Sequence, residues 1–424
     1  QIELFVAQIP AVSGAPEPDP VVLISGGPGQ ATTDLYLGLR PAFEPLRRER
    51  DIIVLDQRGT GRSNRLSCAA ADVDDLETVD PEALRTMVRA CVTELNDDPR
   101  YYTTSVAVGD LERLRQALEV EEWNLYGISY GTRVAQHYLR RYPERARTVI
   151  IDGVVPAEIA LGPEIAIHAQ SALERILSRC EQSAPCAAAF PNLGEKLDTV
   201  RTRLAQDPVE VSMTDPVSGE PVDWVFSERH LQTAIRLMSY APPTAALLPL
   251  LLNEAYDGNY APLTAQAYMM IGDLAESLSF PMHNSVACTE DVPFFNGTEL
   301  EDLEATYLGT DVVDALLTVC SAWPVGEMDN DLKEPLISST PTLLLSGEAD
   351  PVTPPAYAEQ VLGNLSTARH LVGPGQGHGL APVGCVPNLM RRFVQDPDPL
   401  GLDAECLDRE HPSPFFLDFS GPSP

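Results

Sequence analysis

Lysine is nearly absent from this 424-residue chain: only Lys196 and Lys333 occur, and arginine carries almost all of the positive charge. The 62 acidic residues outnumber the 29 lysines and arginines, so the formal net charge at pH 7 is -33. A chain of that charge repels phosphate, which excludes nucleic acid as an expected partner. Uninterrupted apolar runs long enough to cross a bilayer are also missing, so we expect no membrane span.

Signatures of metal and cofactor binding are missing as well. The chain contains no Cys-x-x-Cys pair and no group of His and Cys residues with the spacing of zinc ligands. Its glycine-rich segment at residues 26–29 is not followed by a lysine and does not form the G-x-x-x-x-G-K phosphate loop. We therefore expect a protein that needs neither a metal nor a cofactor.

The eight cysteines, by contrast, form an even set that is closely spaced along the chain. Such a set favours disulfides over eight buried thiols in a cytosolic enzyme, and therefore predicts a secreted or periplasmic protein. No signal peptide is present, but the chain opens within an apparent strand at residues 2–7, as expected if a leader has been removed. We predict disulfides between neighbours, although sequence alone does not fix that choice: Cys68 with Cys91, Cys180 with Cys186, Cys288 with Cys320, and Cys385 with Cys406.

Short apolar runs alternate with helical patterns over the first third of the chain. Continuous apolar strands separated by helices are typical of a mostly parallel sheet with helices on both faces. The apolar runs lie at residues 21–24, 51–56, 123–126 and 148–153, and the helical patterns at about 107–119 and 132–142.

The pattern changes beyond Pro156. Helical stretches rich in Ala and Leu dominate to about Pro335, with few strands, and apolar runs return at residues 342–346 and 369–372. We predict an α/β core formed by residues 1–155 and 336–424, with a mainly helical lid at residues 156–335 inserted into it. The last residues, 411–424, are expected to form an irregular tail.

Ser129 stands in the pentapeptide Gly-Ile-Ser-Tyr-Gly at residues 127–131. The pattern G-x-S-x-G is the nucleophile elbow of the α/β-hydrolase fold, in which a strand turns sharply into a helix with the serine at the tip. Small residues are needed on both sides, because the serine backbone is strained and neighbouring chain packs close to it. An apolar run precedes Ser129 and a helical pattern follows it, as that geometry requires.

A serine hydroxyl needs a base, normally an imidazole that is oriented by a carboxylate. On this fold the acid and then the histidine follow the serine along the chain. Asp350 comes just after an apolar strand, and His378 stands in the glycine-rich loop 373–379 after the last strand. We predict these two residues as the catalytic acid and base. Asp152, at the end of an earlier strand, and Glu348 remain alternatives for the acid.

The oxyanion of a tetrahedral intermediate requires two backbone N–H donors. One should come from the residue after the nucleophile, Tyr130, and the other from the loop after an early strand. Gly-Gly-Pro-Gly at residues 26–29 is suitably placed, and we predict the Gly27 N–H as the second donor.

Three of these segments together resemble the prolyl iminopeptidase-like serine peptidases, most closely their secreted, tripeptidyl aminopeptidase-like branch. They are Gly-Gly-Pro-Gly at 26–29, Asp-Gln-Arg-Gly-Thr-Gly-Arg-Ser at 56–63 and Gly-Ile-Ser-Tyr-Gly-Thr at 127–132. The segment 347–354 and the Cys-rich stretch from Cys385 are similar too. The resemblance implies Ser129, Asp350 and His378 as the triad, with Gly27 and Tyr130 as the oxyanion hole.

Ser25 departs from the family, in which many members have His at this position. Asp56 and Arg58 are expected to form a buried charge pair. Members of the aminopeptidase group hold the substrate's ammonium with lid carboxylates, which implies a substrate-binding role for Glu290 and Asp291. The resemblance thus implies a hydrolase that releases amino-terminal residues or short peptides through an acyl-enzyme on Ser129. A carboxylesterase acting on small esters is the alternative.

Overall fold

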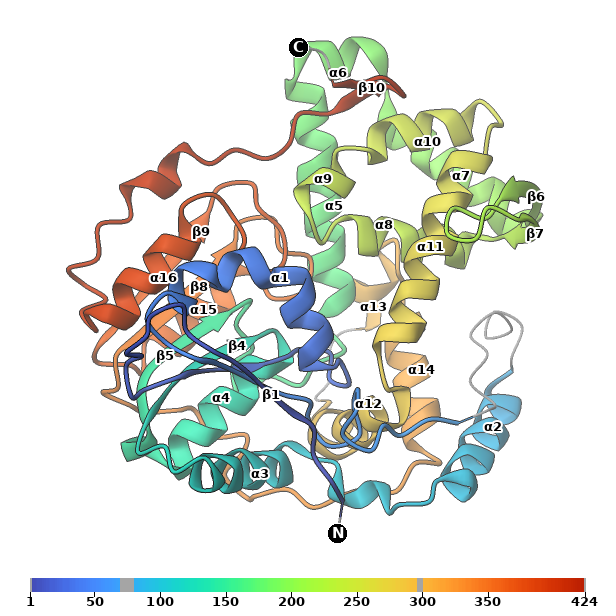
Figure 1. Cartoon of the computed structure of the whole chain (residues 1–424). Coiled ribbons are helices and arrows are strands. Elements are labelled where there is room, and N and C mark those ends of the chain that lie inside the picture. Colours follow the sequence, from blue (N-terminus) through green and yellow to red (C-terminus); the bar gives the residue numbers. More distant parts are fainter. Residues whose placement is uncertain (1, 69–79, 296–299, 423–424) are drawn as a thin grey trace.

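A seven-stranded sheet forms the centre of the computed structural model, which describes residues 2–68, 80–295 and 300–422 (Figure 1). The strand order is β1-β3-β2-β4-β5-β8-β9. Only β1 runs antiparallel to its neighbour; every other adjacent pair is parallel. The strands are β1 (Val6–Ile9), β2 (Val21–Ile24), β3 (Ile52–Leu55), β4 (Trp123–Ile128), β5 (Ala146–Asp152), β8 (Thr342–Gly347) and β9 (Ala368–Gly373).

Helices cover both faces of the sheet, which explains why its central strands are apolar along their whole length. Successive residues of a strand point to opposite faces. Val22 therefore packs with helices on one face, while Leu23 packs with helices on the other. The first face carries α3 (Thr104–Ala117), α4 (Tyr130–Arg141) and α15 (Pro355–Leu362), and the second carries α1 (Thr32–Arg47) and α16 (Val386–Gln395).

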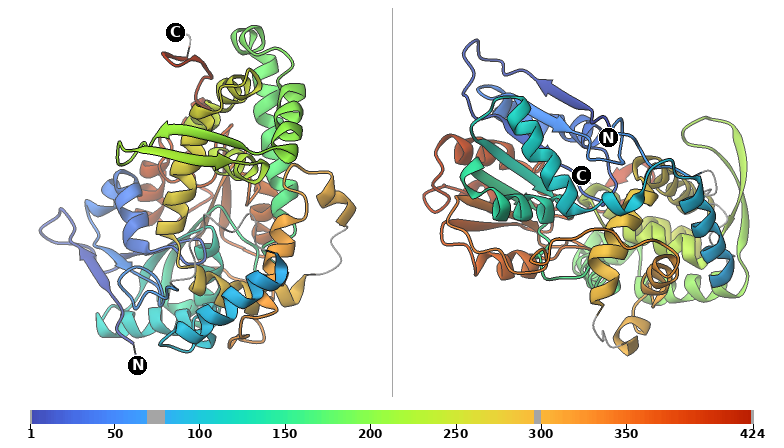
Figure 2. Two further views of the ribbon diagram at one scale, coloured as in Figure 1. Left: turned by 90° about the vertical axis from the view of Figure 1, so that its right-hand side faces the viewer. Right: turned by 90° about the horizontal axis from the view of Figure 1, so that it is seen from below.

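The chain between β5 and β8 forms a mainly helical region beside the sheet (Figures 1 and 2). Much of this region packs around a hydrophobic cluster of its own, which runs from Ala166 to Val313 and also includes Phe415. Its helices are α5 (Ile165–Gln182), α6 (Ala184–Ala189), α7 (Leu193–Gln206), α8 (Glu228–Met238), α9 (Pro242–Ala245), α10 (Leu248–Tyr256), α11 (Ala261–Ser277), α12 (Phe280–Val286), α13 (Leu300–Glu304) and α14 (Asp311–Cys320). We keep the name lid for the segment 156–335.

Two local expectations were wrong, on the first strand and on the tail. The first strand begins at Val6 and not at residue 2. The few strands expected in the lid form one antiparallel hairpin, β6 (Val209–Thr214) with β7 (Pro221–Phe226). The tail is not irregular, because β10 (Phe416–Asp418) pairs with β11 (Gly421–Pro422), and Phe416 N donates to Ala246 O of the lid at 3.1 Å. Tertiary packing on the lid orders a segment whose local sequence carries little signal.

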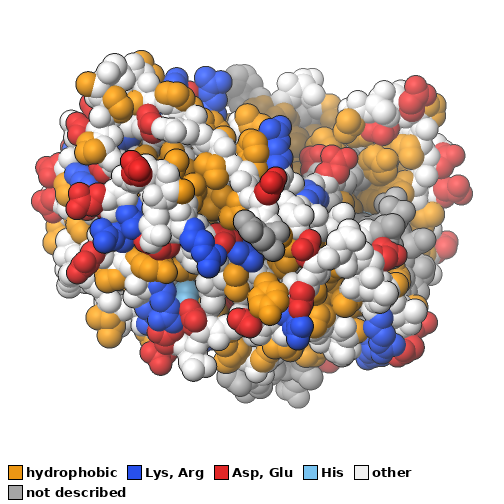
Figure 3. Space-filling model, turned by 60° about the horizontal axis from the view of Figure 1, so that its bottom comes forward, with side chains coloured by type: hydrophobic (Ala, Val, Ile, Leu, Met, Phe, Trp, Pro, Cys, Tyr) orange, Lys and Arg blue, Asp and Glu red, His pale blue; other side chains and the backbone are white. Residues whose placement is uncertain are grey.

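Four disulfides join the cysteines as neighbours along the chain: Cys68–Cys91, Cys180–Cys186, Cys288–Cys320 and Cys385–Cys406. Among the described residues, no helix is long and apolar enough to cross a membrane. On the face turned forward in Figure 3, Lys and Arg side chains are scattered among Asp and Glu and do not gather into one patch. A further helix, α2 (Pro81–Glu94), packs against α14.

Candidate active site

Ser129 occupies the sharp turn between β4 and α4, with φ 55° and ψ -127°. Residues other than glycine rarely adopt a positive φ, so the backbone of Ser129 is strained, as often happens at functional sites. A Cβ on Gly127 would lie 2.5 Å from Gly131 O, and one on Gly131 would clash with Ile24 O. The expectation that only small residues fit beside this serine is confirmed.

Asp350 and His378 meet at the carboxyl ends of the adjacent strands β8 and β9. His378 Nδ1 lies 2.8 Å from Asp350 Oδ2. The Asp350 side chain is fully buried, and that of His378 is 10% exposed. Both backbone N–H groups that follow, those of Val352 and Thr353, donate to Asp350 Oδ1 at 2.8 Å. The carboxylate is therefore fixed in the orientation that a carboxylate–imidazole pair requires.

Thr353 is a member of this arrangement that the sequence reasoning missed. Its hydroxyl donates to Asp350 Oδ2 at 2.8 Å and lies 3.1 Å from His378 Nδ1. A threonine three residues after an acid in a proline-rich turn could have suggested it, because short hydroxyl side chains commonly bond the local chain there.

The two alternative acids lie elsewhere. Asp152 is fully buried, accepts from the backbone N–H groups of Leu380 and Ala381, and accepts from Tyr126 OH at 2.9 Å. It thus holds the loop after His378 and makes no hydrogen bond to the imidazole. Glu348 accepts from Gly375 N at 2.8 Å, and half of its side chain is exposed. The geometry favours Asp350 over both.

Ser129 and His378 stand at the same edge of the sheet, since β4 and β9 both end there. Ser129 N donates to Asp152 O at 2.9 Å, and a Cβ on the next residue, Gly153, would lie 2.9 Å from His378 Cε1. Among the described residues, no hydrogen bond joins Ser129 to His378. Nucleophile and base often come within hydrogen-bond distance only in the complex with substrate.

The loop after β2 lies directly against Ser129. A Cβ on Gly26 would lie 2.9 Å from Ser129 Cβ, and Gly27 has φ +101°, which glycine adopts without strain. Neither Gly27 N–H nor Tyr130 N–H donates a backbone hydrogen bond among the described residues. Both groups are therefore free to bind an oxyanion, and their role in doing so stays a prediction.

The lid contacts both the loop that carries His378 and the glycine-rich loop after β2. Tyr240, between α8 and α9, accepts from His378 N at 2.7 Å through its carbonyl oxygen, and its ring lies edge-on to the imidazole at 5.2 Å. Ser279, just before α12, donates from its N–H to Gly29 O at 2.9 Å. The candidate site is thus enclosed between the sheet edge and the lid.

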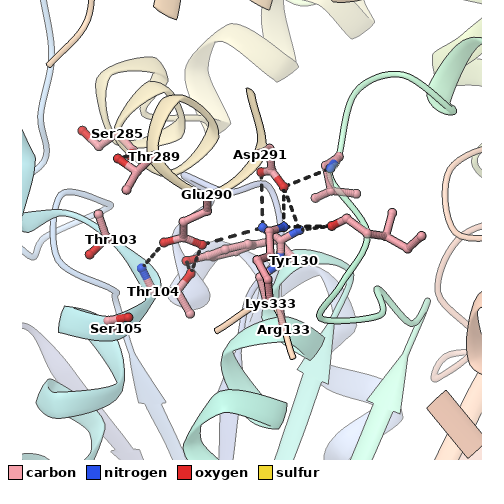
Figure 4. Close-up of polar contacts among 12 residues, drawn as sticks. Thr103, Thr104, Ser105, Tyr130, Arg133, Ser285, Thr289, Glu290, Asp291 and Lys333 are labelled. Carbon is pink, nitrogen blue, oxygen red and sulfur yellow. Dashed lines mark hydrogen bonds and ion pairs between the residues drawn. The ribbon is translucent and has the colours of Figure 1, made fainter. Parts of the chain in front are cut away.

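Glu290 and Asp291 were expected to face the substrate, and the structure places them elsewhere (Figure 4). Both lie in the segment Ala287–Asp291 and are at most 1% exposed. Asp291 accepts from Arg133 at 2.8 and 3.2 Å and pairs with Lys333 at 3.2 Å. Glu290 accepts from Thr104 and lies 3.7 Å from Arg133. Protein cations and donors already occupy these carboxylates, so an amine-binding role does not fit their positions.

Charge is balanced within this cluster, which we call the Arg133 cluster: Arg133, Lys333, Glu290 and Asp291. Burial raises the pKa of Asp291, but Arg133 and Lys333 outweigh burial and hold that pKa below its usual value. Burial and the charge of Arg133 lower the pKa of Lys333 to about 8. The neighbouring cations thus favour the charged form of Asp291, whereas burial disfavours the charged forms of Lys333 and Glu290 and raises the pKa of Glu290 above its usual value.

Replacement of Arg133 by methionine should destabilise the fold strongly. It removes the cation that pairs with Asp291 and leaves two buried carboxylates with Lys333 alone, which typically costs about 3–5 kcal/mol. Urea unfolding followed by circular dichroism measures the change. Arg113→Met is the matched control, because Arg113 is 76% exposed and its ion pair with Asp110 is worth little. Equal free energies of unfolding for Arg133→Met and Arg113→Met would contradict the stabilising role assigned to the ion pairs of Arg133.

The pKa of His378 lies above its ordinary value of 6.5. Burial alone would lower it, but the carboxylates of Asp350 and Asp152 favour the imidazolium and prevail. A general base must be neutral, so kcat/KM should rise with pH through an apparent pKa above 6.5 and level off at alkaline pH. A pH profile with a chromogenic substrate tests this. Full activity persisting well below pH 6.5 would exclude His378 as the base.

One group of described residues has the geometry to hold a metal ion: His137, Asp329 and Asp331. Arg141 already pairs with both carboxylates, and His137 Nε2 lies 2.8 Å from Asp329. The Arg141 guanidinium therefore already pairs with the two carboxylates that would bind a metal ion, and we assign no metal to this group.

The expected Asp56–Arg58 pair was wrong. Arg58 pairs with Asp110 at 2.6 Å, while Asp56 accepts from Thr33 and from Arg62 N. Ser25, the departure from the family pattern, donates to Gln30 O at 2.6 Å and so stabilises the Gly-rich turn.

Two protein families match different parts of the chain. The α/β hydrolase fold family matches residues 19–206, which include Ser129. The TAP-like protein family matches residues 305–406, which include Asp350 and His378.

Individual relatives agree with these matches. A putative hydrolase of Escherichia coli, YuaR, is 25% identical over 93% of this chain and 81% of its own length. The serine protease Hip1 of Mycobacterium tuberculosis is 25% identical over 82% of this chain and 73% of its own length. A probable proline iminopeptidase of Streptomyces coelicolor is 32% identical over 35% of this chain and 38% of its own length. The chain has the α/β-hydrolase fold and is a serine hydrolase; its residues 305–406 are similar to the TAP-like protein family, and its relatives include proteins named as serine peptidases.

Proposed function

We propose that this chain is an exported serine peptidase that removes amino-terminal residues or short peptides from peptide substrates. The observation that carries the proposal is the 2.8 Å pair of Asp350 with His378 at the sheet edge where Ser129 occupies the elbow. The names of the relatives, a serine protease and proline iminopeptidases, favour peptides with a free amino terminus. That preference rests on the relatives and not on Glu290 or Asp291.

In this proposal Ser129 Oγ attacks the scissile carbonyl carbon while His378 Nε2 accepts the hydroxyl proton. Asp350 stabilises the imidazolium that forms, and the N–H groups of Gly27 and Tyr130 bind the oxyanion. His378 then gives the proton to the leaving amine, whose departure leaves an acyl-enzyme. Water repeats the sequence and releases the acyl product, with His378 again as base and then as acid.

Four disulfides support export, because they form and persist in oxidising compartments. Thiol titration of the denatured, unreduced protein, purified from the medium or periplasm of its host, should find no free cysteine. Eight free thiols would count against export.

A matched substrate panel tests the peptidase assignment. Aminoacyl and tripeptidyl 4-nitroanilides with a free amino terminus should be hydrolysed, and their N-acetylated counterparts should be poor substrates. Short acyl esters of nitrophenol complete the panel. Turnover of the esters alone would replace the proposal with a carboxylesterase. Equal turnover of free and acetylated peptides would keep the peptidase and remove the amino-terminal preference.

A further inference from the structure

A chain of buried hydrogen bonds leads from Tyr130, the residue after Ser129, to Glu290 of the lid (Figure 4). Tyr130 OH lies 2.8 Å from Thr104 Oγ1, at the start of α3, and Thr104 Oγ1 donates to Glu290 Oε2 at 2.7 Å. Thr104 N also donates to Glu290 Oε1, at 2.6 Å. All three side chains are fully buried, so water does not compete for these bonds.

The donor and acceptor of each hydrogen bond in this series follow from counting protons. Thr104 has one hydroxyl proton, and the Glu290 carboxylate only accepts, so that proton is donated to Glu290. Thr104 Oγ1 must then accept from Tyr130 OH. The Tyr130 oxygen in turn accepts from Gln57 Nε2 at 3.2 Å. The Tyr130 hydroxyl thus has both a donor and an acceptor, and its ring is held in one position.

The Glu290 end of this series of hydrogen bonds is held in place as well. Glu290 lies 3.7 Å from Arg133, which also pairs with Asp291. The Cys288–Cys320 disulfide ties the same lid segment to the end of α14. Thr104 and Tyr130 are therefore connected to a buried cluster of ion-paired side chains.

We propose that Glu290, Thr104 and Tyr130 OH form a positioning device for the Tyr130 backbone N–H, the predicted oxyanion donor. The inference rests on the proposed function, because it concerns the transition state of the same site. Tyr130 is the first residue of α4 and directly follows the strained Ser129, and its N–H donates no backbone hydrogen bond to any residue that the structure describes. Gln57 and Thr104, which lie outside α4, hold its side-chain hydroxyl.

This role has a kinetic signature that a merely structural role lacks. Charge develops on the oxyanion only in the transition state, so a displaced donor lowers kcat and leaves KM unchanged. The loss should be similar for esters and peptides, since both pass through a tetrahedral oxyanion. A carboxylate that binds the substrate's ammonium would instead affect peptides alone.

Two variants interrupt the series of hydrogen bonds from Tyr130 to Glu290 at different bonds. Thr104→Val removes the hydroxyl and retains the backbone N–H that donates to Glu290, and Tyr130→Phe removes the other hydroxyl. We expect each to lower kcat roughly tenfold with KM unchanged, because small displacements of oxyanion donors are costly. Thr104→Ser, which keeps the hydroxyl, should retain most of the rate.

Matched controls separate positioning from loss of stability. Tyr138 is also a buried tyrosine of α4, and its hydroxyl donates to Glu112 at 2.9 Å, two turns away from Ser129. Thr148 is a buried threonine of β5 that donates to Asn124 at 2.6 Å. Tyr138→Phe and Thr148→Val should lower the unfolding midpoint about as much as the test variants do and leave kcat unchanged.

The rate of labelling by a fluorophosphonate, with the labelled peptide identified by mass spectrometry, completes the experiment. Labelling of Ser129 that slows in Thr104→Val and Tyr130→Phe but not in the controls supports the positioning role. Unchanged labelling and kcat in both variants, with Ser129 labelled normally, overturns the positioning role alone. A parallel loss in the controls also overturns it. Failure to label Ser129 in the unmodified protein overturns the proposed function and this inference with it.

Discussion

Ser129→Ala is expected to lower kcat about a millionfold, because removal of a serine nucleophile eliminates the acyl-enzyme route altogether. The elbow holds this side chain at φ 55°, between a β-strand and the first turn of α4, and alanine fits the same backbone. The fold should therefore survive. Hydrolysis of the best nitroanilide, measured together with the unfolding midpoint, gives both quantities.

Ser346→Ala is the control for this experiment. Ser346 is fully buried near the end of β8, at the same edge of the sheet, and its hydroxyl bonds His370 at 3.0 Å and not His378. Its loss should leave kcat unchanged. Ser129→Ala should still bind substrate, because the oxyanion loop and the lid contacts remain. Retained turnover in a correctly folded Ser129→Ala protein would falsify the proposed mechanism.

The elbow could be predicted from sequence because the forces that create it are local. A strained serine requires glycine on both sides, and the clashes that a Cβ would make at Gly127 and Gly131 explain both. Similarly, Asp350 and His378 each follow a strand, and the ends of parallel strands meet at one edge of the sheet.

The partners of buried charges could not be predicted in the same way. Arg133 and Asp291 are 158 residues apart, and only the packing of α4 against the lid brings them together. Asp56 and Arg58 are two residues apart in sequence and yet bond different residues. Sequence proximity carries little information on ion pairs, because a buried charge takes whichever opposite charge the tertiary structure supplies.

The contacts of Glu290 and Asp291 argue against the amine-anchor expectation, for the same physical reason. Family resemblance indicated that Glu290 and Asp291 lie in the lid, but not that Arg133 and Lys333 would occupy their oxygens. A substrate's ammonium would have to compete with these buried protein cations for the same carboxylate oxygens.

Asp350→Asn is expected to lower kcat about ten-thousandfold. The aspartate accepts from His378 Nδ1, which places the imidazole proton on Nδ1 and leaves Nε2 free to accept the serine proton. An asparagine amide would donate to Nδ1 and favour the opposite tautomer, in which Nε2 already carries the proton. Loss of the carboxylate also removes the charge that raises the pKa of His378, so the apparent pKa of kcat/KM should fall.

Two further variants show whether Asp350 is the acid. Glu348→Gln changes a half-exposed carboxylate two residues away and should leave kcat unchanged. Asp152→Asn keeps an oxygen that can accept from Leu380 N and Ala381 N, so it should cost far less than Asp350→Asn. If Asp152→Asn instead caused the ten-thousandfold loss and Asp350→Asn caused little, the acid would be Asp152. The apparent pKa should fall in both variants, because both carboxylates favour the imidazolium, so the size of the kcat loss decides: only the carboxylate that accepts from Nδ1 also controls the tautomer of His378.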